Sequence, residues 1–142
     1  MHSLKLFAAG LLMSASASFA APPAFLTLDH SSEVLIDKAG ADAVWHQQLD
    51  GKALRLAKLY PVAKWGFVSQ VEGGFTADKA CVVTARAMLV PRSGKNLTFK
   101  PTKSAMVFDS KAGLDQAQCK DLAKAKLVEA IEAVTSSLIA SK

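Results

Sequence analysis

The sequence predicts a two-layer α+β domain, in which a helical segment, a three-stranded antiparallel sheet and a long C-terminal helix follow one another. Three observations support this order. Good helix formers dominate residues 41–60, a β-branched extended stretch covers residues 81–90, and an apolar stripe at helical spacing follows Asp115. Helices before and after a run of strands are typical of an α+β arrangement rather than an alternating α/β fold.

The first twenty residues have the order of a secretory signal peptide. Lys5 precedes an apolar run, small residues follow, and Ser18 and Ala20 suit the two positions that a signal peptidase must accept. The apolar run is shorter than the ~20 residues that span a bilayer, so we expect cleavage after Ala20 rather than a retained anchor. We therefore expect a periplasmic or secreted bacterial protein, with no transmembrane segment after cleavage.

Cleavage would leave an N-terminal arm over residues 21–40 and a single α+β domain over residues 41–142. The arm begins with two prolines, Pro22 and Pro23, and has little helical pattern, so we expect it to be extended. Within residues 41–60, Asp50-Gly51 is a weak point that divides the segment into two short helices. Pro61 ends the second one, because the residue before a proline is disfavoured in helical conformation.

Three extended stretches follow the helical segment, at residues 65–71, 81–90 and 97–108. The middle one predicts the central strand, with alternate side chains on its two faces. One face is expected to meet the core and consists of Cys81, Val83, Ala85, Ala87 and Leu89. Pro101 interrupts the third stretch and predicts a sheet edge or a bulge there.

The last segment predicts a helix from Asp115 to about Ala140. Asp115 and Gln118 have the spacing of a capping box, in which each side chain binds the other residue's backbone N–H. An apolar stripe then recurs at steps of three and four residues: Cys119, Ala123, Leu127, Ile131, Val134 and Leu138.

The two cysteines, Cys81 and Cys119, are predicted to form a disulfide. An even number of cysteines in an exported protein favours a bond, because the compartment is oxidising. Both residues are expected on inward faces, one on the central strand and one on the last helix, so the bond would clamp the helix to the sheet. Two buried free thiols are the alternative.

Positive charge is concentrated in the middle of the chain. The formal net charge is +5, and it becomes +4 when Lys5 is lost with the signal peptide. A solvated face is one interpretation of this charge, and weak binding to anionic surfaces at low salt is the other. The candidate anion-binding residues are Arg86, Arg92, Lys95, Lys100 and Lys103.

Motifs for catalysis, cofactors or metals are scarce. The mature chain keeps only His30 and His46, and neither belongs to a recognisable nucleophile motif. Glu72, beside a glycine pair, is the one carboxylate considered for acid–base chemistry, and a solvated strand end is its plainer interpretation. Met88 and Met106 could meet across strands to bind Cu(I), although core methionines are commoner. We assign no catalytic residue, no metal ligand and no cofactor.

These observations favour a small exported non-catalytic protein that binds a protein or an envelope component. The first alternative is a small secreted hydrolase with an unrecognised site. The second is a polyanion-binding module that uses the basic strand region. A nucleic acid partner is not expected, because an exported protein rarely meets one.

Overall fold

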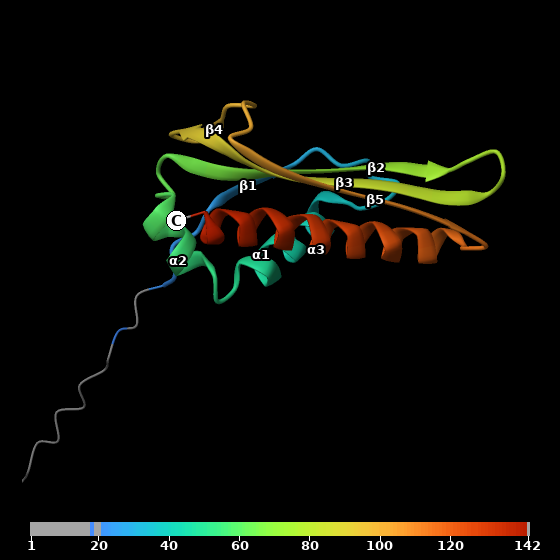
Figure 1. The fold of residues 1–142 in the computed structure, drawn as a ribbon, viewed down its shortest axis with the longest axis horizontal. Coiled ribbons are helices and arrows are strands. Elements are labelled where there is room, and N and C mark those ends of the chain that lie inside the picture. Colours follow the sequence, from blue (N-terminus) through green and yellow to red (C-terminus); the bar gives the residue numbers. More distant parts are fainter. Residues whose placement is uncertain (1–17, 19–20, 142) are drawn as a thin grey trace, which may run out of the picture.

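The computed structural model describes Ser18 and residues 21–141, so the predicted signal peptide lies outside the described residues apart from Ser18. Figure 1 shows a sheet with the helices packed along one of its faces. The elements are β1 (Leu26–Asp29), α1 (Lys38–Leu49), α2 (Ala53–Leu59), β2 (Trp65–Phe75), β3 (Ala80–Ser93), β4 (Asn96–Leu97), β5 (Lys103–Ala112) and α3 (Gln116–Ala140). None of these helices has the length and apolar character that crossing a membrane requires.

The α+β class is confirmed, but the sheet has five strands instead of the predicted three. The strands β2, β3 and β5 form the expected antiparallel part, whereas β1 pairs with β2 in parallel and β4 pairs with the end of β3. The two additional strands have four and two residues, and such short segments give no clear periodicity. The segment expected as an arm therefore supplies a strand of the sheet.

The predicted alternation of the central strand is confirmed. Cys81, Val83, Ala85, Ala87 and Leu89 are all fully buried and belong to the main core. The apolar stripe of α3 packs against the same face of the sheet, with buried residues from Cys119 to Leu138. The main core thus lies between the sheet and the helices.

The start of α3 and its attachment to the sheet also agree with the prediction. The Asp115 carboxylate accepts the Gln118 backbone N–H at 2.8 Å, and the Gln118 side chain accepts the Asp115 N–H at 2.8 Å. Cys81 and Cys119 form a disulfide with an S–S distance of 2.02 Å. The bond fixes the first turn of α3 to the central strand.

The helical segment is divided at Asp50-Gly51, as predicted, into α1 and α2. Gly51 has a φ of 73°, a backbone conformation that favours glycine. The first helix starts at Lys38, earlier than expected, because the Asp37 carboxylate accepts the Gly40 N–H at 2.7 Å and caps it.

A second, smaller core lies on the sheet face opposite the helices. Val68, Met88 and Val90 are buried there, and Leu97 packs on them. Leu97 belongs to the link between β3 and β5, which Figure 1 shows on the side away from the helices. This link covers one end of the outer face and leaves the outer side chains of β5 uncovered, including Met106 and Phe108.

Candidate functional site

The residues of β1 are attached to the core by a chain of polar contacts. The Trp45 indole donates to Ser69 Oγ at 3.0 Å, and Ser69 Oγ donates to Asp29 Oδ1 at 2.6 Å. The same carboxylate oxygen accepts from Ser31 Oγ at 2.7 Å, and Ser31 Oγ accepts the Val71 N–H at 2.8 Å. These contacts hold the N-terminal segment against both α1 and β2.

Three aromatic rings lie beside this network. Phe67 stacks with Trp45 at a centroid distance of 5.0 Å and meets Phe25 edge to face at 5.1 Å. All three residues are buried or nearly so, with Phe25 8% exposed. Aromatic packing of this kind adds stabilisation beyond the area that it buries. The three packed rings form the base of the adjoining surface.

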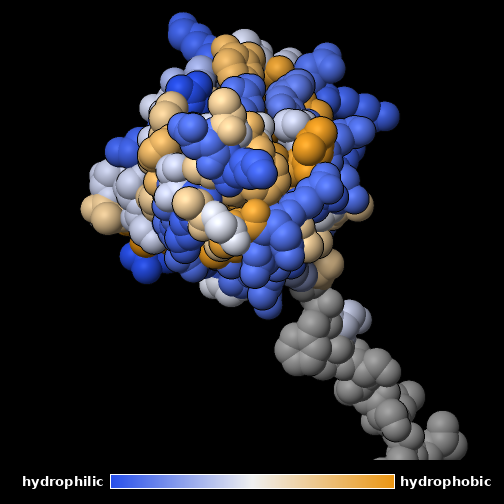
Figure 2. All heavy atoms as spheres, turned by 90° about the vertical axis from the view of Figure 1, so that its right-hand side faces the viewer, coloured by the Kyte–Doolittle hydropathy of each residue, from blue (hydrophilic) through white to orange (hydrophobic). Residues whose placement is uncertain are grey.

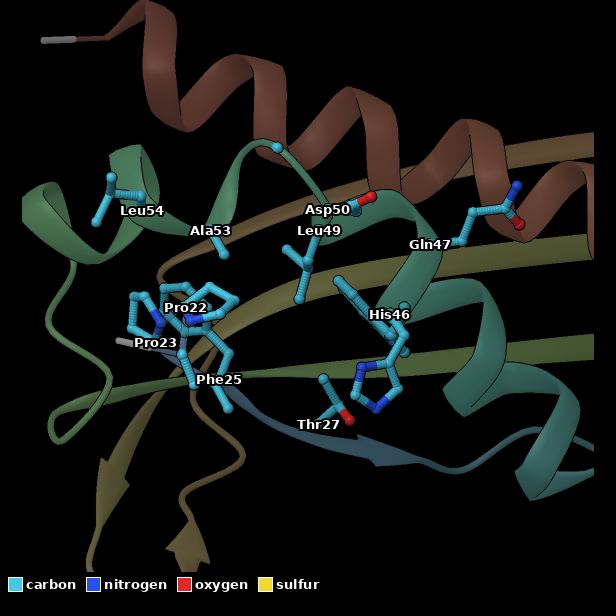
Figure 3. Close-up of a pocket in the computed structure, with 14 residues that line it drawn as sticks. Pro22, Pro23, Phe25, Thr27, His46, Gln47, Leu49, Asp50, Ala53 and Leu54 are labelled. Carbon is cyan, nitrogen blue, oxygen red and sulfur yellow. The ribbon is translucent and has the colours of Figure 1, made fainter. Parts of the chain in front are cut away.

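A cleft of about 690 Å³ opens above this aromatic base, between the start of the described chain and the helices α1 and α2. Figure 3 shows Pro22, Pro23 and Phe25 on one side, facing Leu49, Ala53 and Leu54 across the opening. Most of the lining is apolar, and Leu54 is 61% exposed. Leu54 therefore leaves apolar surface in contact with water at the mouth of the cleft, next to the apolar lining.

Polar groups gather at one end of the cleft. The Thr27 hydroxyl donates to Asp42 Oδ1 at 3.1 Å, and His46 Nε2 lies 3.7 Å from Asp42 Oδ2. Asp50 and Gln47 also line the opening. In a nucleophilic triad the histidine stands between the carboxylate and the hydroxyl. Here the carboxylate stands between the other two, so His46 is not placed to take a proton from Thr27.

The other residues considered for catalysis or metal binding lie elsewhere. Glu72 is exposed on β2, where it accepts a hydrogen bond from Gln70 at 2.6 Å. His30 is exposed just after β1. Met88 is fully buried in the smaller core, whereas Met106 is 56% exposed, so the two thioethers have different environments. Within the described residues, no group of three or more His, Cys, Asp or Glu side chains could hold a metal ion.

The five candidate anion-binding residues do not form one compact cluster. Arg92 donates to the carbonyl oxygens of Gly94 at 2.7 Å and Val62 at 2.8 Å, so its guanidinium is partly engaged by the protein itself. Arg86 is half-buried on the outer face of β3. The remaining three side chains are exposed on the β3–β5 link and the start of β5: Lys95, Lys100 and Lys103.

Sequence reasoning missed the cleft. Residues 21–40 were expected to form an extended arm, and their pattern gave no sign that they form one wall of an opening. The exposed Leu54, on the solvent side of a short helix, was the one available signal.

The chain is thus defined as an α+β protein with its helices on one face of a mixed sheet and an apolar cleft beside the first strand. No known protein family and no curated protein matches its sequence.

Solved structures of similar outline exist. A PelC dodecamer from Paraburkholderia phytofirmans is 10% identical, with 82% of this chain and 90% of that chain covered and a TM-score of 0.49. A variant of the same dodecamer is 11% identical, with coverages of 82% and 95% and a TM-score of 0.46. A Caulobacter crescentus protein described as a lipoprotein is 14% identical, with coverages of 80% and 89% and a TM-score of 0.37. At these values the similarities identify neither a family nor a function.

Proposed function

We propose that this chain is an exported, non-catalytic binding protein whose cleft takes up an apolar segment of a peptide or protein that also carries positive charge. The observation that carries the proposal is the apolar cleft, which Asp50 lines and beside which Asp42 contacts Thr27 and His46. Its volume of about 690 Å³ lies within the ~300–1,000 Å³ that is typical of ligand sites.

The apolar lining supplies the driving force for binding. Phe25, Trp45 and Leu49 are packed into the core, so the base of the cleft is preformed and does not have to be ordered by the ligand. Leu54 and the two prolines add apolar surface that a ligand would remove from water. Each Å² of apolar surface buried contributes about 25 cal/mol before the cost of association.

Charge favours a cationic ligand. Asp50 lines the cleft, and Asp42 contacts two of its lining residues. Between Ala21 and Leu54 the acidic residues outnumber the lysines. Complementary charge accelerates encounter and disfavours partners of the same sign. An anionic lipid headgroup therefore fits this rim less well than a lysine- or arginine-bearing peptide.

Two features support an extracytoplasmic location. The first is the signal-peptide pattern of residues 1–20, and the second is the disulfide between Cys81 and Cys119. Structural disulfides persist mainly in oxidising compartments, such as the bacterial periplasm. The partner is accordingly sought among proteins and peptides of the cell envelope.

The test is binding of short fluorescent peptides of leucine and phenylalanine that end in either lysine or glutamate. We expect the lysine peptide to bind more tightly, and Leu54→Asp to weaken its binding by tenfold or more. Val34 is the matched control because it is 62% exposed and does not line the cleft, so Val34→Asp should leave binding unchanged. Equal binding of the two peptides, or equal effects of the two substitutions, would contradict the proposal.

Binding of polyanions is a second candidate function, favoured by the exposure of Lys95, Lys100 and Lys103 around the β3–β5 link. At physiological salt the Debye length is ~8 Å, so such a patch is largely screened. We expect binding to heparin or anionic vesicles at low salt only, and its loss when the three lysines are replaced together by glutamine. Binding that withstands salt and the triple substitution would place the contact elsewhere.

A further inference from the structure

The strand β5 forms an open edge of the sheet. It has ten residues, and β3 is its single strand neighbour in the described part of the chain. Along such an edge every second residue directs its backbone N–H and C=O away from the sheet. Long open edges are templates for pairing with another strand, and proteins commonly shield them.

The outer side chains of this edge strand are unusually apolar for an exposed position. Met106 is 56% exposed and Phe108 is 64% exposed, and both lie on the sheet face opposite the helices. Figure 2 views the molecule from the end where β2 turns into β3, and it shows hydrophobic side chains among hydrophilic ones on the surface. Methionine, phenylalanine and arginine are enriched in protein interfaces, and Arg86 lies opposite Met106 on β3.

We infer that two copies of this chain pair through β5, antiparallel and about a two-fold axis that passes beside Met106. In this register Lys103 of one copy lies opposite Asp109 of the other, because each is three residues from Met106. The two-fold axis repeats this contact, so the interface contains two pairs of opposite charge, each formed by Lys103 and Asp109. Met106 meets its own copy at the centre, and Phe108 reaches Met106 of the other copy diagonally.

The neighbouring registers that keep the same faces together are less favourable. Centring the pairing on Val107 would place Lys103 opposite Lys111, and like charges directly opposite one another are destabilising. Centring it on Ala105 would place Asp109 opposite Pro101, which has no N–H to donate and precedes the strand. The charge pattern of the strand thus selects the register centred on Met106.

The Asp109 carboxylate is already held at this edge. It lies 3.3 Å from Lys126 Nζ of α3, and its other oxygen accepts the Ser110 N–H at 2.8 Å. A carboxylate fixed in this way loses little conformational freedom when Lys103 of a second copy approaches. The opposite edge of the sheet, β1, has only four residues and offers a shorter template.

The first test is the molar mass of the full mature chain across a wide range of concentration, by sedimentation or light scattering. We expect a concentration-dependent dimer. Lys103→Glu should raise the dissociation constant about tenfold, since it turns two attractive pairs into repulsive ones. Lys95→Glu, the same change of charge on the exposed β3–β5 link outside this strand, is the matched control and should change the dissociation constant little. The exchange Lys103→Glu with Asp109→Lys should restore the dimer.

A second measurement is independent of these charges. Met106→Cys should be joined to its copy by a short bis-maleimide reagent, because the two side chains meet at the axis. Ser104→Cys, on the same face, should not react in this way, since its two copies would lie about 14 Å apart along the strands. A chain that stays monomeric at all concentrations, or Ser104→Cys cross-linking as well as Met106→Cys, would overturn the inference.

Discussion

The indole Nε1 of Trp45 donates a hydrogen bond to Ser69 Oγ at 3.0 Å, and this contact joins α1 to β2 inside the core. Ser69 is fully buried, and its own hydroxyl donates a hydrogen bond to Asp29 Oδ1 at 2.6 Å. The Ser69 hydroxyl therefore accepts a hydrogen bond from Trp45 of α1 and donates one to Asp29 of the edge strand β1. Because buried polar groups are costly when unpaired, the helix, the central part of the sheet and β1 are energetically linked at this point.

Replacing Ser69 by alanine should destabilise the fold. The Trp45 N–H loses its acceptor and Asp29 loses a donor, at a cost of about 1–3 kcal/mol in the free energy of unfolding. Equilibrium unfolding in urea measures this cost. Ser104→Ala on the exposed face of β5 is the control and should stay within about 0.5 kcal/mol of the wild type. Equal stabilities for the two variants would mean that the hydrogen-bond chain contributes nothing.

Removing the disulfide should lower stability more than any single surface change. Cys81 and Cys119 are 38 residues apart in sequence, and closing a loop of this size corresponds to about 4 kcal/mol in the chain-entropy description. The double variant Cys81→Ala with Cys119→Ala should unfold at a much lower urea concentration than the oxidised wild type. The reduced wild type should behave similarly. An unchanged unfolding midpoint in both would contradict this expectation.

The ion pair between Asp109 and Lys126 at the edge of the sheet predicts a lowered pKa for the Asp109 carboxyl group. Partial burial raises the pKa of Asp109, but the Ser110 N–H, the hydrogen bond from Lys126 and the charges of Lys126 and Lys111 outweigh it, and the pKa falls below its ordinary 3.8. A lowered pKa in the folded state means that this contribution to stability is present above pH 3.8 and is lost as the pH falls through the folded value.

Carboxyl chemical shifts followed by NMR measure this pKa directly. The midpoint for Asp109 should lie below 3.8 in the wild type and move upward in Lys126→Ala. A midpoint for Asp109 that does not move would show that Lys126 does not act on it.

Gly66 is predicted to be intolerant of any side chain. A Cβ there would lie 2.5 Å from Leu97 Cδ2 and 2.7 Å from the carbonyl oxygen of Leu26. The leucine can move, but the carbonyl belongs to the backbone of β1, so Gly66→Ala should cost about 1–3 kcal/mol by urea unfolding. Adding Leu97→Ala should recover only part of the loss. Full recovery of the stability would indicate that the backbone of β1 can move away from the added methyl group.

Much of the fold could be predicted from local sequence features. The capping box at Asp115, the break at Asp50-Gly51 and the alternation from Cys81 to Leu89 are short-range signals, and each lies where the sequence placed it. The pairing of Cys81 with Cys119 followed from their inward-facing positions. These predictions succeeded because each rests on a local signal, either the periodicity of the apolar residues or the cap or break of a helix.

The strand β1 and the cleft depend on contacts between distant residues, and no local pattern encodes them. Leu26 to Asp29 form a strand because β2 offers a parallel edge and because Ser69, 40 residues away in sequence, donates a hydrogen bond to the Asp29 carboxylate. The cleft exists only once this strand has brought Pro22 and Pro23 opposite α2. A two-residue strand such as β4 is likewise fixed by its partner rather than by its own composition.

The parallel pairing of β1 with β2 has a consequence for the order in which the chain can fold. A polypeptide is synthesised from its N-terminus, so Leu26 is available first, yet the partner of this residue, Gly66, follows only after α1 and α2. Loop closure over such a span is entropically unfavourable until the β2–β3 hairpin offers a formed edge. The segment that forms β1 thus remains unpaired until β2 and β3 have formed, and its docking, like closure of the disulfide with Cys119, becomes a late step of folding.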